Sequence, residues 1–253
     1  MRKVFVIAMT TLRELFREKI FYIIFFAGVV VIALSLLFGA MSFDERTKML
    51  IDFGYAAAQL SLLCLSVFLG SSLLSKEIEK QTCLLVLSRP VSREQFLLGK
   101  FMGVFFLLLI TGIFMNAIIL TLLADASYFV HSWLVTLSLI LENSVILGFV
   151  FFLSTFVRPV IAMLGGFSLF FLGHWLPDMI FFAKKSQNPS MLSLAETLLW
   201  IIPQFFQFNW KTYFFFQSQF NFSEVLLMVG HCVSWMTIAL LLSLLLIRKK
   251  DIV

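Results

Sequence analysis

The chain is 253 residues long, 61% hydrophobic and only 13% charged, with 32 Phe and a mean hydropathy of +1.02. These values exclude a water-soluble globular domain, in which about half of the residues are apolar and about a quarter are charged. The net charge of +5 does not indicate nucleic-acid binding, because the Lys and Arg residues flank hydrophobic runs instead of forming one basic patch.

The first predicted element is an amphipathic helix within residues 1–19. Apolar side chains recur at helical spacing on one face, and basic side chains lie on the other. The apolar set is Phe5, Met9, Leu12 and Phe16, and the basic set is Arg13 and Arg17. This pattern predicts a helix at the membrane interface, with the aromatic stripe at the acyl boundary. The alternative is a solvated lead-in whose charges only set the topology.

Six later runs are long and apolar enough to cross a hydrocarbon core, which takes about 20 helical residues. The predicted spans are residues 20–41, 53–74, 101–123, 133–157, 160–182 and 225–247. The predicted fold class is therefore an all-α integral membrane protein. A charged segment precedes a full-length first span, so we expect no cleaved signal peptide.

The Lys and Arg residues predict the orientation of these spans. Most of the 19 lie in the first 19 residues, in residues 75–100, at Arg158 and in residues 248–253, and few lie in the opposite loops. Positively charged loops stay in the cytoplasm. We therefore expect both termini and residues 75–100 on the cytoplasmic side.

The cytoplasmic segment 75–100 has two helical signatures separated by Pro90. Its first half is charged and then apolar over residues 84–87, which suits a short helix with one end buried in a partner. In its second half Ser92 and Gln95 form a capping box that predicts a new helix leading into the third span. A well-capped loop would explain the second half but not the first.

The predicted external segment, residues 183–224, is too polar and too interrupted by proline to span the membrane. Ser193 and Glu196 resemble a capping box, so a short helix is expected over residues 194–202. Aromatic and amide residues then alternate over residues 204–222, as expected for backbone at the headgroup level. This stretch is either an outer gate that contacts an amphipathic substrate or a plain aromatic belt.

Polar residues within the spans point to a site inside the bundle. Glu142 and Asn143 lie deep in the fourth span, where an ionisable group costs at least about 2.5 kcal/mol unless protein or water surrounds it. Glu142 is expected to line a translocation path, accept a proton or hold a cation, or else to bond a neighbouring helix. Gln59 and Asn116 are expected to form hydrogen bonds between helices.

Other chemistry finds little support in the sequence. His174 and Asp178, four residues apart, could share a helix face, but two residues do not make a metal site. The three cysteines lack metal-ligand spacing. No G-x-x-x-x-G-K-[ST] phosphate loop occurs, so nucleotide energy would have to come from a partner. An intramembrane enzyme, or a membrane scaffold without transport, remains the alternative interpretation.

Residues 76–100 resemble the cytoplasmic loop of ABC-2 type permeases, which has a charged start, a Thr, paired leucines, Pro-Val-Ser-Arg and a terminal Gly-Lys. Residues 11–19 and 248–252 are similar to the termini of that family. The chain looks closest to the permeases associated with maturation of multicopper enzymes. It departs from the family at Gln81, where a Gly usually precedes the Thr.

The resemblance implies a permease subunit of an exporter in the bacterial cytoplasmic membrane, with no enzymatic activity of its own. Two permease chains, here expected to form a homodimer, would pair with two ATP-binding subunits. ATP and Mg²⁺ would bind to those subunits, so no cofactor is expected in this chain. Residues 1–19 would be the connecting helix. The residues implied in ATPase coupling are Glu77, Glu79, Thr82, Leu84, Leu85, Arg89 and Pro90.

The whole chain, residues 1–253, is expected to form one permease domain in the lipid bilayer. Its predicted parts are the connecting helix (1–19), spans one and two (20–74), the coupling segment (75–100), spans three to five (101–182), the external segment (183–224), span six (225–247) and the cytoplasmic tail (248–253).

Overall fold

The computed structural model describes residues 2–41, 46–79, 92–124, 126–186, 189–211 and 221–249, and these ranges contain helices and no strand. The elements are α1 (Arg2–Leu15), α2 (Lys19–Met41), α3 (Arg46–Glu79), α5 (Arg93–Leu123), η1 (Ala126–Tyr128), α6 (Phe129–Ser154), α7 (Pro159–Ser186), α8 (Pro189–Ile201), η2 (Phe205–Phe208) and α10 (Phe222–Lys249). The predicted all-α class is confirmed.

Six helices of the described chain are long and apolar enough to cross a membrane: α2, α3, α5, α6, α7 and α10. They coincide with the six predicted spans, but several extend beyond them. The second predicted span covers residues 53–74, whereas α3 runs from Arg46 to Glu79. Hydropathy marks the part of a helix that lies in hydrocarbon, and backbone hydrogen bonding continues past it into the polar region.

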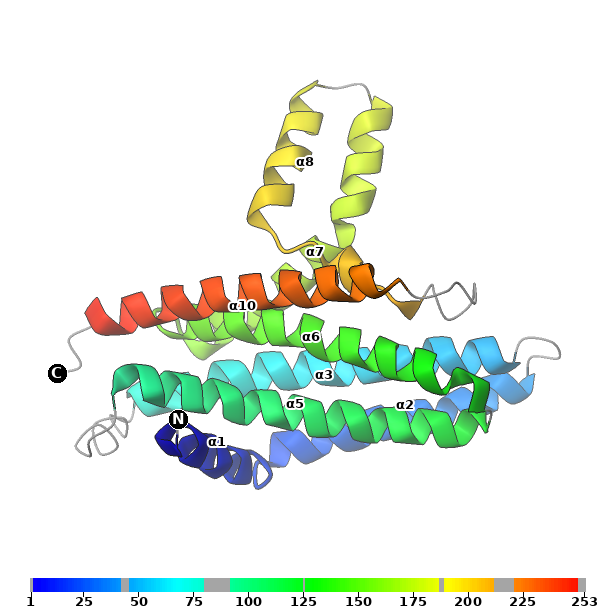
Figure 1. The fold of residues 1–253 in the computed structure, drawn as a ribbon, viewed down its shortest axis with the longest axis horizontal. Coiled ribbons are helices and arrows are strands. Elements are labelled where there is room, and N and C mark those ends of the chain that lie inside the picture. Colours follow the sequence, from blue (N-terminus) through cyan, green and yellow to red (C-terminus); the bar gives the residue numbers. More distant parts are fainter. Residues whose placement is uncertain are drawn as a thin grey trace.

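The long helices lie side by side along the length of the molecule (Figure 1). Helix α3 is central and packs against α2, α5, α6 and α7, and α10 covers α6. The start of α1 and the end of α10 lie at the same end of the bundle, as an even number of spans requires (Figure 1).

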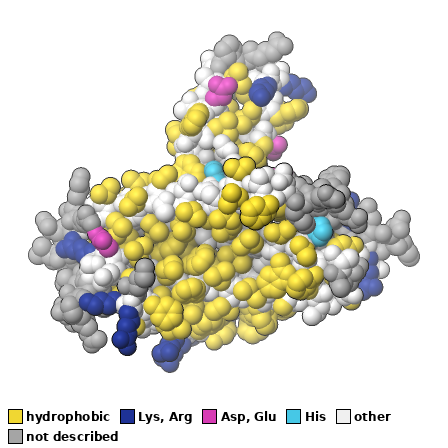
Figure 2. All heavy atoms as spheres, in the orientation of Figure 1, with side chains coloured by type: hydrophobic (Ala, Val, Ile, Leu, Met, Phe, Trp, Pro, Cys, Tyr) yellow, Lys and Arg dark blue, Asp and Glu magenta, His cyan; other side chains and the backbone are white. Residues whose placement is uncertain are grey.

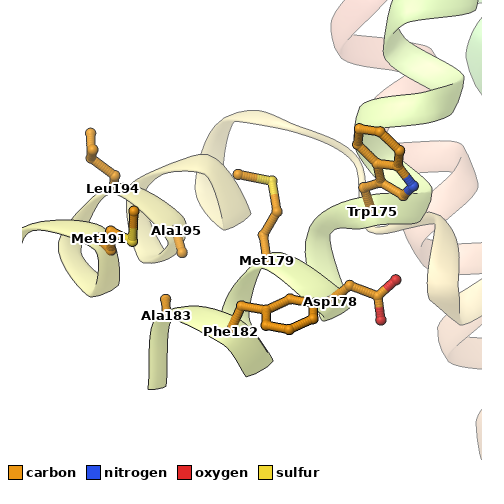
Figure 3. Close-up of a pocket in the computed structure, with 8 residues that line it drawn as sticks. All are labelled: Trp175, Asp178, Met179, Phe182, Ala183, Met191, Leu194 and Ala195. Atoms are coloured by element: carbon orange, nitrogen blue, oxygen red, sulfur yellow. The ribbon is translucent and has the colours of Figure 1, made fainter. Parts of the chain in front are cut away.

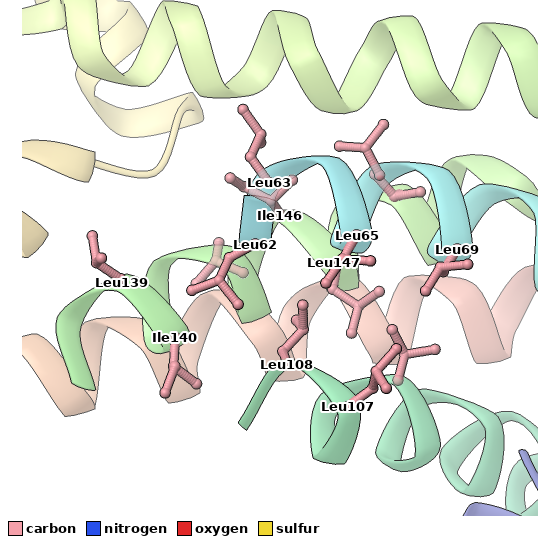
Figure 4. Close-up of a cluster of buried hydrophobic side chains, with 14 of the residues drawn as sticks. Leu62, Leu63, Leu65, Leu69, Leu107, Leu108, Leu139, Ile140, Ile146 and Leu147 are labelled. Atoms are coloured by element: carbon pink, nitrogen blue, oxygen red, sulfur yellow. The ribbon is translucent and has the colours of Figure 1, made fainter. Parts of the chain in front are cut away.

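Leucine and isoleucine side chains of α3, α5 and α6 meet in the core (Figure 4). Leu62, Leu107, Ile146 and Leu147 are fully buried there. Apolar side chains also cover the outer surface of the bundle, and Lys and Arg gather near its ends (Figure 2). A bundle that is apolar inside and outside is suited to lipid as its solvent.

Helix α7 approaches the bundle closely through a glycine. A Cβ atom on Gly166 would lie 2.6 Å from Cγ2 of Val150 and 3.0 Å from Cγ2 of Val67. The absence of a side chain at Gly166 thus permits this close helix packing.

Helix α1 packs tightly against the start of α5. Gly99 and Gly103, spaced as in a GxxxG motif, face it: a Cβ on Gly103 would lie 2.7 Å from Cβ of Thr11 and 2.9 Å from the carbonyl oxygen of Ala8. An ion pair adds to this contact, with the buried Lys100 Nζ 3.2 Å from Oε2 of Glu14.

The buried face of α1 differs from the predicted apolar stripe. Leu12 is buried with Ala8, Thr11 and Leu15, whereas Phe5 and Met9 are exposed. Ala8 and Thr11 of α1 contact the α5 backbone at Gly103, where no side chain stands between the two helices. The large side chains of Phe5 and Met9 lie on the face that points away from α5. Phe5 and Met9 are therefore free to contact lipid.

The second half of α7 leaves the bundle. Pro177 lies inside the helix and cannot donate to the carbonyl of Gly173, and beyond it α7 and α8 form a hairpin that projects sideways (Figure 1). The predicted helix start at Ser193 is wrong. Helix α8 already begins at Pro189, and the Ser193 hydroxyl donates to the carbonyl of Ser190 within the helix. Proline is favoured in the first turn of a helix, which explains the earlier start.

Candidate functional site

A cavity of about 380 Å³ lies between α3, α6, α7 and the segment that contains η2. Its walls are mostly apolar, with a few polar groups. The lining residues are Ala56, Gln59, Leu60, Leu63, Val135, Ser138, Leu139, Glu142, Phe170, His174, Phe208, Asn209, Trp210 and Lys211.

Glu142 lies near the midpoint of α6 and is only 2% exposed. Its Oε1 accepts a hydrogen bond of 2.9 Å from Nε2 of Gln59 on α3. The amide of Gln59 in turn accepts one of 3.1 Å from Nδ2 of Asn143, which also donates to the carbonyl of Leu139. The predicted inward orientation of Glu142 and the predicted interhelical bonding of Gln59 are confirmed.

Glu142 still has a free oxygen. Its Oε2 receives no hydrogen bond from any described residue, and the carboxylate lines the cavity. A carboxylate has about four lone-pair sites, so one donor leaves most of its acceptor capacity open. The free oxygen gives the cavity an unpaired acceptor at mid-membrane depth.

His174 on α7 faces the same carboxylate. Its Nε2 lies 3.6 Å from Oε1 of Glu142, and its Nδ1 lies 3.1 Å from the carbonyl of Phe170. A carbonyl oxygen can only accept, so Nδ1 carries the proton of the neutral ring. Nε2 then donates toward Glu142 when the ring is protonated, and presents a lone pair when it is neutral.

His174 and Asp178 do not share a site, contrary to the predicted common face. Asp178 lines a different cavity, of about 510 Å³, between the second half of α7 and α8 (Figure 3). The remaining walls of that cavity are apolar, and they include Trp175, Met179 and Phe182. The kink at Pro177 separates the two residues, because the ideal four-residue register does not continue through it.

Residues 204–211, which include η2, close one side of the Glu142 cavity, and we call them the re-entrant segment. Phe205 of η2 packs against Gly173, where a Cβ would clash with its ring, and the backbone N–H of Gln204 donates to Nε2 of His231 at 3.2 Å. His231 lies about 14 Å along α10 from its start at Phe222, at 1.5 Å per residue. The segment from 204 to 211 therefore packs against α7 and α10 beyond the first turns of α10. Its predicted position at the headgroup level stays a prediction, and residues 212–220 are outside the described chain.

Lys211 lies beside the cavity at the end of this segment. Burial lowers the pKa of its ammonium group, and the charge of Asp52 opposes that effect. Trp210 is buried beside it, and its indole N–H donates to the carbonyl of Gln207 at 3.0 Å. The mouth of the cavity thus combines a cation with an opposing acidic charge.

A separate polar cluster joins three helices. Asn116 of α5 accepts hydrogen bonds from the hydroxyls of Tyr55 on α3, at 3.1 Å, and Ser132 on α6, at 3.0 Å. This confirms the interhelical bonding predicted for Asn116. Within the part of the chain that is described, no three His, Cys, Asp or Glu residues are grouped to hold a metal ion.

The predicted coupling residues are only partly within the described chain. Glu77 and Glu79 belong to the last turns of α3, which continues unbroken from the second span. Thr82, Leu84, Leu85, Arg89 and Pro90 lie outside the described residues. Beyond them the predicted capping box is confirmed: the Gln95 N–H donates to Oγ of Ser92, and the Ser92 N–H donates to Oε1 of Gln95.

Sequence reasoning identified the polar residues of the site singly but did not bring them together. Nothing in the sequence pairs Gln59 with Glu142 or places Lys211 at the cavity. The G-K-F-M-G pattern at 99–103 is visible in the sequence and could have predicted the close approach of α1.

Comparison with known proteins gives one family. Residues 33–252 match the family described as ABC-2 family transporter protein, which covers most of the chain. No curated protein matches the sequence.

Proposed function

Because this chain belongs to the ABC-2 family of transporter proteins, we propose that it is the permease of an ATP-driven exporter in the bacterial cytoplasmic membrane. The observation that carries the proposal is the family match over a bundle with six helices able to span a membrane. The sequence has no phosphate loop of its own, so a separate subunit would hydrolyse ATP and bind Mg²⁺.

Helix α3 would transmit movement from such a subunit to the cavity, because one continuous helix contains residues of both regions. It runs as one helix from Gln59 to Glu79, about 30 Å at 1.5 Å per residue, and Gln59 bonds Glu142. ATP binding would clamp two partner subunits together. Their different affinities for two positions of the coupling segments would shift the bundle between inward-closed and outward-open states.

Helix α1 would act as the connecting helix of the same cytoplasmic unit. It is clamped against α5 at Gly99 and Gly103, and α5 begins directly after the coupling segment. A displacement of the coupling segment would therefore move α1 and α5 together. The basic residues Arg13 and Arg17 would face headgroups or the partner subunit.

Glu142 and Asn143 would line the translocation path. Glu142 lies near the midpoint of α6 and lines a cavity whose walls come from three spans and the re-entrant segment, and Asn143 beside it donates to Gln59, which also lines the cavity. Intramembrane carboxylates that face a cavity commonly mark a substrate pathway. The re-entrant segment would then be the outer gate rather than an aromatic belt.

The hairpin of α7 and α8 supports a homodimer. His174 lies beside Glu142, which is near the midpoint of α6. Pro177 follows His174 by three residues, so the hairpin would leave the bundle near the middle of the membrane. Lys184 and Lys185 lie near the far end of this hairpin, and both are exposed in the single chain. Lipid-exposed helix ends and charges are costly at that depth, so we propose that a second copy covers the hairpin.

The export direction, the association with multicopper enzyme maturation and the cytoplasmic location of both termini are predictions. The ATP-binding partner, its copy number and the homodimer are predictions as well. The alternative function, an intramembrane enzyme or a scaffold, would require activity without an ATP-binding partner. No residue of the described chain forms a metal group or a known catalytic motif that favours it.

The docking assignment is tested by substitutions in the coupling segment. Glu79→Lys and Leu85→Asp should abolish co-purification of the ATP-binding subunit while membrane insertion stays normal. The matched control is Ser223→Asp, an added charge at an exposed position predicted to lie at the external end of the bundle. A normal yield of complex from both coupling variants would refute the assignment.

A further inference from the structure

We infer that the Glu142 cavity binds an organic cation, a substituted ammonium with an apolar body, as the transported substrate. The inference rests on the proposed function and names the substrate class of the same site. Three observations carry it: the charge of the cavity, its aromatic walls, and its size together with the lack of a metal-ligand set among the described residues.

The first observation is charge. Glu142 offers a free Oε2 to the cavity, and the one hydrogen bond to its other oxygen comes from the neutral amide of Gln59. Lys211 is the other charged group of the lining, and Asp52 lies close enough to act on it electrostatically. The positive charge of Lys211 is thus opposed by Asp52, which leaves Glu142 as the acidic group of the lining. A bound cation would stabilise its ionised form.

Among the described residues of the lining, His174 is the remaining titratable group, and it faces the carboxylate. When its ring is neutral, Nε2 presents a lone pair toward Glu142, because Nδ1 donates to the carbonyl of Phe170. The lone pair and the carboxylate oxygen are both acceptors, so the pair disfavours an anion and favours a positive ligand beside it. A bound cation would therefore take the place of the positive charge that a protonated ring supplies.

The second observation is the aromatic lining. Phe170, Phe208 and Trp210 form walls around the polar end of the cavity. The Phe170 and His174 rings lie 4.5 Å apart, so ring faces and edges close one side of it. Aromatic faces attract ammonium groups, and most strongly where water is excluded. Apolar side chains beside them would hold the uncharged part of the ligand.

The third observation is size and coordination. A cavity of about 380 Å³ is at the small end of the range for small-molecule sites, which excludes a folded domain or a whole lipid. A bare metal ion is disfavoured because the described residues hold no group of three acidic, His or Cys ligands. A compact organic cation needs one carboxylate and an aromatic wall, and the cavity provides both.

The test uses two probes of the same shape. Benzyltrimethylammonium carries a quaternary nitrogen, and neopentylbenzene has a carbon atom in its place. Binding of each is measured by titration calorimetry to the full chain in lipid nanodiscs without nucleotide. Saturable binding of the cation and at least about tenfold weaker binding of the neutral probe are expected.

The matched variants are Glu142→Gln and Glu196→Gln. Glutamine at 142 keeps the shape and can still accept the hydrogen bond from Gln59, so the bundle should fold. It should weaken cation binding by roughly tenfold or more, because a charged partner is lost. Glu196 is an exposed carboxylate on α8 away from the cavity, and its change should have no effect. Equal affinity for the two probes, or unchanged affinity in Glu142→Gln, would overturn the inference.

The design separates this inference from the proposed function. Cation binding to the isolated chain does not depend on an ATP-binding subunit. If an ATPase co-purifies but the chain binds no cation, the substrate class is wrong and the permease assignment stands. If the cation binds in a Glu142-dependent way but no ATPase associates, the site stands and the transporter assignment fails.

Discussion

Substitution of Gly103 by Ala should release α1 from the bundle. The new Cβ would lie 2.7 Å from Cβ of Thr11 and 2.9 Å from the backbone oxygen of Ala8, whereas carbon atoms pack at about 3.5–4.0 Å. The backbone oxygen cannot rotate away, so α1 must move back by roughly 1 Å. Overpacking of this kind costs about 1–3 kcal/mol, more than the gain of about 1 kcal/mol from replacing a helical glycine.

Hydrogen exchange of residues 2–15 measures this release directly. Loss of one to two kcal/mol of docking free energy should speed exchange across α1 by about 5- to 30-fold. Gly230→Ala is the matched control, because a Cβ there would meet nothing within 4 Å. Unchanged exchange of α1 in Gly103→Ala would show that the glycine contact does not hold the helix.

Four further substitutions, at three positions, test the polar contacts. Lys100→Glu should place a like charge beside Glu14 and speed exchange in α1, whereas Lys100→Met should have a smaller effect because Glu14 is more than half exposed. Gln59→Leu should remove the donor to Glu142 and lower the free energy of unfolding by about 1–3 kcal/mol, measured by denaturant unfolding in detergent. Asn116→Leu should cost a similar amount, about 1–3 kcal/mol, since two hydroxyls on neighbouring helices lose their acceptor. If Gln59→Leu and Asn116→Leu had the same free energy of unfolding as the wild type, their hydrogen bonds would not stabilise the fold.

The six spans and the capping box at Ser92 could be predicted because both depend on local signals. Hydropathy over about 20 residues reports the hydrocarbon crossing, and Ser and Gln three residues apart report a helix start. The inward orientation of Glu142 also followed from physics, since a carboxylate cannot face lipid cheaply. Each of these depends on a residue and its near neighbours in sequence.

The convergence of Gln59, Glu142 and His174 could not be predicted in the same way. The three residues come from α3, α6 and α7, and their contact depends on which helix faces pack together. Hydrophobic periodicity is weak in helices that are apolar on every side, so it does not select a face. The site could therefore be identified only from the tertiary structure.

The hairpin shows a different limit. Pro177 signals a kink, but its direction depends on what packs beside Gly173, which is Phe205 from a segment far along the chain. The start of α8 was misplaced because Ser193 and Glu196 fit a capping pattern while Pro189 opens the helix earlier. Two competing local signals were present, and the structure follows the proline.

The most direct test of the account is purification of the tagged full chain from membranes in mild detergent, followed by mass spectrometry of the eluate and an ATPase assay. We expect an ATP-binding subunit at near equal stoichiometry, with ATP hydrolysis that the chain alone lacks. A homo-oligomer that contains no ATP-binding subunit and hydrolyses no ATP would contradict the assignment as a transporter permease.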